Sequence, residues 1–190
     1  MRAALNLLVL FFVIFSAPNS VVAGEPDFTV CAGDVLQITV WKEEGLDKEV
    51  MVLPDNTITF PLIGTISVAG MSPGQMQAAI KDKLKEVVPD ASVTVIVKSP
   101  LGHTASVLGQ VAKPGSFVMA QKFSVMQALS QAGGLTPYAS EGSIVILRQE
   151  DGKKISIPFP YKDVANGRNL DKDIALRPGD VVVVPTAGLF

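Results

Sequence analysis

The sequence is poor in the residues that carry most enzymatic and metal chemistry. Among 190 residues it has one cysteine, Cys31, and one histidine, His103. A disulfide within the chain is therefore excluded, and zinc sites, which draw several ligands from these two residue types, are not expected. Neither a phosphate-binding glycine-rich loop nor a dinucleotide fingerprint occurs. The sequence predicts no metal and no cofactor.

Charge is sparse and nearly balanced. Lysine and arginine total 16, aspartate and glutamate total 18, and the formal net charge is -2, with no run of basic residues. A protein that holds a nucleic-acid backbone needs a concentrated positive surface. We therefore expect no nucleic-acid partner.

Few residues could act as catalytic groups. His103 is the only candidate imidazole base, no acid lies close to it in the sequence, and the Gly-x-Ser-x-Gly motif is absent, which disfavours a serine hydrolase. Glycoside hydrolysis needs two carboxylates facing each other across the scissile bond. The candidate acids fall mostly in turns or charged loops: Glu43, Glu44, Asp55, Asp90, Glu141, Asp163 and Asp180. The sequence favours a protein that is not an enzyme.

Two single residues have alternative interpretations. Cys31 could be a lipid attachment site, but the residues before it are not the small ones expected there, so a small buried hydrophobic side chain is favoured. Trp41 ends a predicted strand and could stack on a sugar ring, although packing in a core or an interface is favoured.

The first 23 residues have the pattern of a secretory signal peptide. Arg2 precedes an apolar stretch of 11 residues, 5–15, which is interrupted only by Asn6. This stretch is shorter than the roughly 20 residues that span a bilayer as a helix. We expect cleavage after Ala23 and export of residues 24–190, with an uncleaved membrane anchor as the alternative.

The exported part divides into two units that both mix strands and helices. In the first unit, alternating residues predict strands at 34–41, 49–53, 58–60, 65–69 and 92–98, and a capped amphipathic pattern predicts a helix from Ser72 to about Val87. In the second, strands are predicted at 104–111, 117–119, 144–147, 154–157 and 181–184, with a helix after Ser124. Residues 99–102, Ser-Pro-Leu-Gly, mark the boundary. The predicted fold class is α+β in two small domains, residues 24–99 and 100–190.

Turn residues punctuate both units. Glycine permits left-handed backbone, proline fixes φ, and aspartate bonds its own backbone, so we expect structural rather than ligand-binding roles for these residues. They are Gly33, Asp34, Pro54, Asp55, Pro114, Gly115, Gly133, Gly134, Pro178, Gly179 and Asp180. Residues 32–35 and 178–181 are weakly similar to each other, an internal similarity in which Gly-Asp precedes a predicted strand that begins with a β-branched residue.

Two ordered sets of motifs resemble known domains. Residues 32–41, 53–64 and 68–72 closely resemble the polysaccharide export domain of the outer-membrane polysaccharide export (Wza-like) family. Residues 107–111, 114–115, 128–130, 132–136 and 139–140 resemble a soluble-ligand-binding β-grasp (SLBB) domain, and residues 177–181 with Pro185 resemble its closing strand. Asn56 stands where the family usually has glycine, a change that the same turn can accommodate.

The resemblance implies a ring-forming component that carries capsular polysaccharide or exopolysaccharide across the periplasm. Its implied partners are the polysaccharide, further copies of itself, an inner-membrane polysaccharide co-polymerase and an outer-membrane pore protein. Full-length channel members of the family have further repeats and a C-terminal pore helix, and we expect this chain to lack its own outer-membrane helix. The expected location is the periplasm, peripheral to the outer membrane. A monomeric periplasmic glycan-binding adaptor is the alternative, and the sequence does not identify sugar-contact residues.

Overall fold

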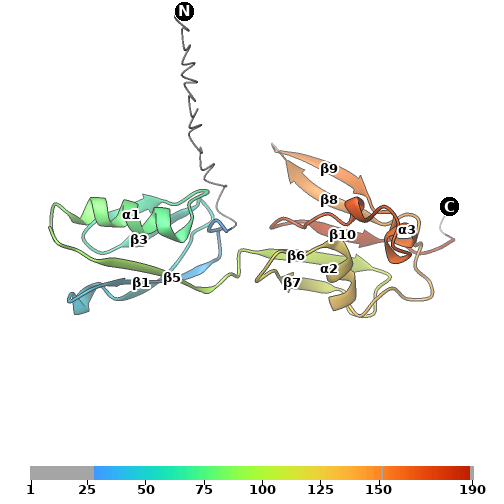
Figure 1. Ribbon diagram of the computed structural model, residues 1–190, viewed down its shortest axis with the longest axis horizontal. Helices are drawn as coiled ribbons and strands as arrows, with labels where there is room; N and C mark the ends of the chain where they lie inside the picture. Colours follow the sequence, from blue (N-terminus) through green and yellow to red (C-terminus); the bar gives the residue numbers. More distant parts are fainter. Residues whose placement is uncertain (1–27, 151, 189–190) are drawn as a thin grey trace, which may run out of the picture.

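Two lobes lie end to end, joined by one short linker (Figure 1). The computed structural model describes residues 28–150 and 152–188, so the predicted signal peptide, residues 1–23, lies outside the described residues. Each lobe combines a sheet with helices and has its own hydrophobic core. The predicted α+β class is confirmed.

The first lobe consists of a three-stranded sheet, a β-hairpin and one main helix. The elements are β1 (Val35–Val40), η1 (Glu44–Leu46), β2 (Lys48–Met51), β3 (Thr57–Phe60), β4 (Gly64–Ser67), α1 (Pro73–Leu84) and β5 (Val93–Ser99). The sheet order is β2-β1-β5, and β3 pairs with β4. Alternation in β1 buries Leu36, Ile38 and Val40 against the core, as the sequence pattern predicts.

Helix α1 begins with the predicted capping box. The Ser72 hydroxyl accepts a hydrogen bond from the Gln75 N–H, and the Gln75 side chain accepts one from the Ser72 N–H. The prediction that this helix continues to Val87 is wrong, because α1 ends at Leu84 and Val87 is exposed. Pro89 restricts the backbone of the residue before it, which favours a turn over another helical turn.

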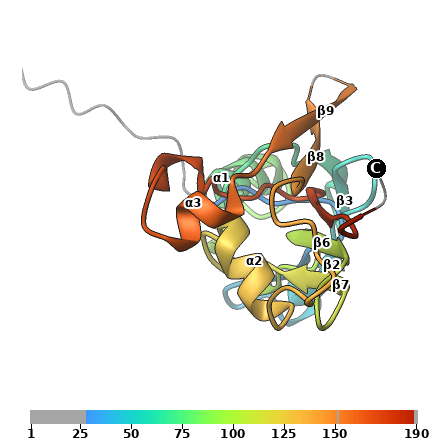
Figure 2. The same ribbon diagram turned by 90° about the vertical axis from the view of Figure 1, so that its right-hand side faces the viewer.

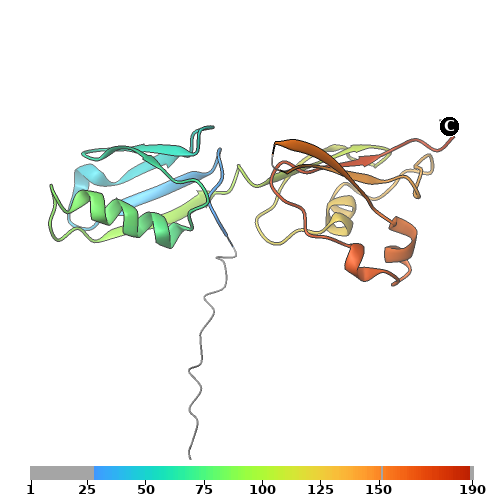
Figure 3. The ribbon, with the colours of Figure 1, turned by 90° about the horizontal axis from the view of Figure 1, so that it is seen from above.

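The second lobe is built on a five-stranded sheet. Its elements are β6 (Thr104–Gly109), β7 (Gly115–Val118), α2 (Val125–Gln131), β8 (Val145–Glu150), β9 (Lys153–Pro158), α3 (Tyr161–Ala165), η2 (Leu170–Lys172) and β10 (Val181–Val184). The order is β7-β6-β10-β8-β9, with β10 parallel to β6 and antiparallel to β8. Helices α2 and α3 lie on the same side of this sheet (Figures 2 and 3).

Three short elements were not predicted from the sequence. These are α3, η1 and η2, none longer than five residues. A segment of this length has too few residues to display a helical repeat of apolar positions. Within the part of the chain that the structure describes, no helix has both the length and the apolar character needed to cross a membrane.

Candidate functional site at the junction of the lobes

A buried carboxylate joins the two lobes. Asp34 stands just before β1 and is 0% exposed. Its Oδ2 accepts a hydrogen bond from the Cys31 N–H, and its Oδ1 accepts one from the Gly102 N–H, both at 2.9 Å. The Nε2 atom of His103 lies 3.3 Å from Oδ2. Because Gly102 and His103 lie in the linker between β5 and β6, this one carboxylate ties the linker to the first lobe.

The linker approaches the first lobe so closely that only glycine fits at position 102. A Cβ atom on Gly102 would lie 2.4 Å from the Ala32 carbonyl oxygen and 2.9 Å from the Cys31 Cβ. The Phe28 ring stacks on His103, the next residue of the linker, with a centroid separation of 4.5 Å. Close packing at two consecutive linker residues, Gly102 and His103, therefore restricts how the lobes meet.

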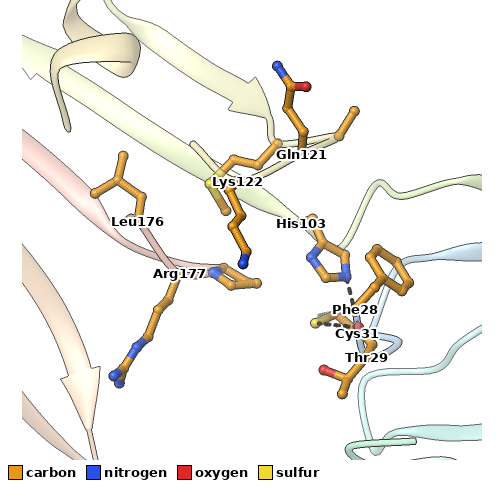
Figure 4. A pocket seen from close by; sticks show the side chains of 11 residues that line it. Phe28, Thr29, Cys31, His103, Gln121, Lys122, Leu176 and Arg177 are labelled. Atoms are coloured by element: carbon orange, nitrogen blue, oxygen red, sulfur yellow. Dashed lines mark hydrogen bonds between the residues drawn. The ribbon is translucent and has the colours of Figure 1, made fainter. Parts of the chain in front are cut away.

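An open pocket of about 500 Å³ lies at this junction (Figure 4). Both lobes line it, through Phe28, Thr29, Cys31, His103, Met119, Ala120, Gln121, Lys122, Leu176, Arg177 and Pro178. Figure 4 shows the Lys122 side chain extending into the space between His103 and Arg177, whereas the guanidinium of Arg177 points away from this space. Arg177 donates to Glu150 at 2.9 Å. The surface of the pocket is mainly apolar.

The junction brings together a thiol, an imidazole and a carboxylate, but not in the arrangement of a nucleophilic site. Burial raises the pKa of the Cys31 thiol, and the nearby negative charge of Asp34 raises it further. Catalytic cysteines need the opposite shift, toward the thiolate. The Nε2 atom of His103 lies 3.1 Å from the Thr29 carbonyl oxygen, which places the imidazole against backbone and Asp34. The geometry supports a structural joint.

The raised pKa of Cys31 has two measurable consequences. At pH 8, we expect iodoacetamide to alkylate Cys31 more slowly in the folded chain than in urea, because less thiolate is present. The pKa of the Cys31 thiol is higher in the folded chain than in the unfolded chain. The stability that the protonated thiol contributes is therefore complete below the unfolded pKa and is lost as pH rises through the folded pKa. Alkaline urea titrations of the native chain and Cys31→Ser test this. An equally steep alkaline loss in both proteins would contradict it.

Asp180 in the second lobe has the same local geometry as Asp34. Gly33 has φ +96° and Gly179 has φ +86°. Each aspartate accepts from the backbone N–H three residues earlier, that of Cys31 at 2.9 Å and that of Arg177 at 2.8 Å. The internal similarity between residues 32–35 and 178–181 therefore corresponds to the same turn before β1 and before β10.

The two aspartates differ in their partners. Whereas Asp34 contacts the linker, Asp180 binds Arg148, whose Nη2 lies 2.6 Å from Oδ2 and whose Nε lies 3.0 Å from Oδ1. Both members of this ion pair are buried, and Arg148 also donates to the Ala175 carbonyl oxygen at 3.0 Å. Its hydrogen bonds to Asp180 raise the pKa of Arg148, which keeps the guanidinium charged.

The other turn residues lie apart from the junction. Asp55 accepts from the Thr57 N–H at 3.1 Å in the turn before β3, and Pro54 precedes it. Pro114 precedes Gly115, the first residue of β7.

Two consecutive glycines follow α2. Gly133 and Gly134 have positive φ and donate to the carbonyl oxygens of Ser130 and Leu129, both at 2.9 Å. They also line a second pocket beside Tyr161. Of the predicted turn residues, Gly33, Asp34 and Pro178 are those that the structure brings to the junction, because Gly33 packs against the backbone of Gly102.

Several important side chains were not identified from the sequence. The pairing of His103 with Asp34 connects residues far apart in the chain, so no local pattern reveals it. Arg148 had a usable signal, because it continues the inward alternation of Ile144 and Ile146 and thus places a charge among buried residues. Trp41 is 70% exposed, which excludes core packing, one of its favoured interpretations.

A search of the described residues, 28–150 and 152–188, finds no group of three or more histidine, cysteine, aspartate or glutamate side chains placed to hold a metal ion. Asp34 and Asp180 are instead satisfied by backbone N–H groups and by protein cations or imidazole. These two carboxylates therefore act as structural contacts.

Comparison with known proteins agrees with the order of the two lobes. Residues 22–98 match the family described as "Polysaccharide biosynthesis/export protein", and residues 104–158 match the SLBB domain. The first match ends at β5, and the second begins at β6. The sheet of the second lobe also includes β10, which lies beyond the matched residues.

Curated relatives are polysaccharide export proteins. The chain is 28% identical over 172 residues to the polysialic acid transport protein KpsD of Escherichia coli, covering 89% of this chain and 30% of KpsD. It is 28% identical to the capsule polysaccharide export outer membrane protein CtrA of Neisseria meningitidis, covering 83% and 44%. For the EPS I polysaccharide export outer membrane protein EpsA of Ralstonia nicotianae, the identity is 26%, with coverage of 83% and 47%.

The chain thus spans less than half the length of these relatives. Its two lobes nevertheless match two domain families in consecutive order, and the relatives named above all carry polysaccharide export or transport in their names. As the resemblance of residues 32–72 and 107–140 predicted, residues 22–98 match the polysaccharide export family and residues 104–158 match the SLBB domain, so the chain carries these two domains in this order.

Proposed function

We propose that this protein is a periplasmic, ring-forming component of an apparatus that exports capsular polysaccharide or exopolysaccharide. In this role the polymer moves through the assembly and none of its bonds is altered. The observation that carries the proposal is the export domain followed directly by the SLBB domain, in a chain related to capsule and exopolysaccharide export proteins. We propose residues 24–99 and 100–190 as its two functional units.

Assembly from several copies is supported by an uncovered apolar surface on the second lobe. Helices α2 and α3 cover one face of the five-stranded sheet, and the opposite face carries Leu108, Val118 and Leu147, all exposed. Val183 of β10 lies in register with Leu108 of β6 and so extends this surface across the central strand. Apolar surface of this kind is common where proteins associate, and repeated head-to-tail contacts between identical subunits form a ring when the rotation between neighbours closes.

The proposed partners are the polysaccharide, an inner-membrane polysaccharide co-polymerase and an outer-membrane pore protein. The proposed location is the periplasmic side of the outer membrane, in keeping with relatives that are named outer membrane proteins. A monomeric glycan-binding adaptor in the same compartment is the second candidate, and it is supported by the open junction pocket.

Deleting the gene tests the export function. We expect polymer to accumulate inside the cell envelope and to disappear from the surface, because the conduit is incomplete. The measurement is the amount and location of polymer in the deletion strain and in a strain complemented with the native gene. Normal secretion in the deletion strain would overturn the proposal, as would normal secretion of a polymer with altered chain length, which is the result expected for a processing enzyme.

Native mass spectrometry of the exported chain tests the assembly. We expect an oligomer with a defined number of subunits, whose population rises with protein concentration. Leu108→Glu should reduce this population by placing a charge in the apolar surface. Lys154→Glu changes charge at the edge strand β9 and serves as the control. A strictly monomeric wild-type chain, in the presence and absence of membrane extract, would favour the adaptor.

A further inference from the structure

The only tryptophan of the chain stands exposed on a well-anchored backbone. Trp41 follows β1, and its backbone N–H donates a hydrogen bond to the Ser92 carbonyl oxygen at 2.9 Å. Lys42 has φ +67°, and the Glu43 N–H donates to the Val40 carbonyl oxygen at 3.1 Å, which closes a tight turn. The indole is therefore presented to solvent from a defined position, at the end of β1 farthest from the second lobe (Figure 1).

Fixed polar groups surround a shallow groove beside this indole. The groove has a volume of about 190 Å³ and is lined by Thr39, Val40, Trp41, Lys42, Glu43, Glu44 and Asp47. The Asp47 carboxylate accepts hydrogen bonds from the Gln37 side-chain amide and, at 3.1 Å, from the Thr39 hydroxyl. Both bonds end on the same carboxylate oxygen, Oδ1, so the second oxygen of this groove-lining carboxylate keeps its capacity to accept a hydrogen bond.

We infer that this groove binds a sugar unit of a neutral or amino-sugar polysaccharide, with Trp41 stacking on the face of the sugar ring. The C–H groups on that face carry partial positive charge and match the negative face of the indole. Sugar hydroxyls donate to the carboxylate of Asp47. The inference rests on the proposed export function and adds to it the class of polymer and a contact residue.

The charges around the groove determine which polymers it takes. Three carboxylates, those of Glu43, Glu44 and Asp47, stand against the single amine of Lys42. An acidic sugar placed on Trp41 would meet like charges that line the same groove, which is unfavourable even in water. Neutral sugars avoid this repulsion, and protonated amino sugars gain attraction.

The same surroundings argue against a protein contact at this place. The cores of protein interfaces are depleted in charged residues, whereas charged side chains flank Trp41 on the loop that follows it. The uncovered apolar surface on the second lobe, around Leu108 and Leu147, has the character of a subunit contact. The two surfaces therefore suit different partners.

Intrinsic fluorescence reads this site directly, because Trp41 is the only tryptophan. We titrate the exported chain with maltohexaose, cellohexaose and a chitosan hexamer, and with a galacturonic acid hexamer as the acidic probe. We expect a blue shift with at least one of the first three at a Kd of about 1 mM, and binding of the acidic hexamer at least about fivefold weaker at low salt. No shift with any of the first three probes, or equal binding of the acidic hexamer, overturns the inference.

Variants locate the binding by ligand-observed NMR. Trp41→Ala should weaken the binding of the responding hexamer at least about tenfold, whereas Tyr138→Ala, which removes an equally exposed aromatic ring on the other lobe, should leave it unchanged. Glu43→Gln combined with Glu44→Gln should bring the acidic hexamer closer to the neutral one. Equal losses in the Trp41 and Tyr138 variants would overturn the assignment, as would emission that changes with protein concentration instead of with glycan.

Failure of this inference is separable from failure of the proposed function. Polymer export in the gene-deletion strain tests the function and does not depend on the groove. If export requires the chain while no hexamer binds, the inference alone is overturned. If export does not require the chain, the proposed function fails whatever the titration shows.

Discussion

Replacing Arg148 by methionine is expected to destabilise the second lobe by about 3–5 kcal/mol. The substitution leaves the Asp180 carboxylate, which is 1% exposed, as an uncompensated buried charge with only the Arg177 N–H as a partner. It also removes the hydrogen bond to the Ala175 carbonyl oxygen. Urea unfolding followed by circular dichroism measures the loss, and hydrogen exchange with mass spectrometry assigns it to a lobe.

Two further variants separate burial of the charge from loss of an ion pair. Arg177→Ala breaks a comparable pair with Glu150 that is exposed, so its cost should stay below about 1 kcal/mol. Arg148→Met combined with Asp180→Asn removes both charges and keeps an acceptor for the Arg177 N–H, so it should recover much of the stability. A loss in Arg148→Met no larger than in Arg177→Ala would contradict the role assigned to this pair.

Asp34→Ala is expected to loosen the junction between the lobes. The substitution leaves the N–H groups of Cys31 and Gly102 without their acceptor, at a cost of about 1–3 kcal/mol for each donor that stays unpaired. His103 loses its carboxylate contact as well. Small-angle scattering of the exported chain should then show a broader distribution of maximum dimensions, and urea unfolding should begin earlier.

Asp55→Ala is the matched control for Asp34→Ala. Asp55 also accepts a backbone N–H in a turn, that of Thr57 at 3.1 Å, but this bond is exposed, so water replaces the lost acceptor. We expect scattering identical to that of the native chain. If the Asp34 and Asp55 variants have the same scattering and the same stability, Asp34 does not hold the lobes together.

Local features of this fold could be predicted because each depends on neighbours in the sequence. The capping boxes of Ser72 with Gln75 and of Ser124 with Gln127 are both formed. The alternation in residues 34–41 separates buried from solvent-facing side chains correctly. In these cases, backbone geometry alone determines which atoms meet.

The candidate site could be predicted only in part, because its contacts join residues far apart in the chain. Asp34 was singled out for a turn, which accounts for its bond to Cys31 but not for its bond to Gly102 in the linker. The exposure of Trp41 depends on whether another element covers the outer face of the first sheet, and nothing local to residue 41 encodes this. Family resemblance supplied the order of the domains, whereas these contacts required coordinates.

The position of β10 has a consequence for how the chain reaches its native state. The first lobe is formed by residues before the linker, so it can complete its sheet and core while later residues are still being synthesised or translocated. In the second lobe, residues 181–184 fill the space between β6 and β8, so these two strands lack their shared neighbour until that segment arrives. We therefore expect the first lobe to fold before the second, and the edges of β6 and β8 to be open to aggregation until β10 docks between them.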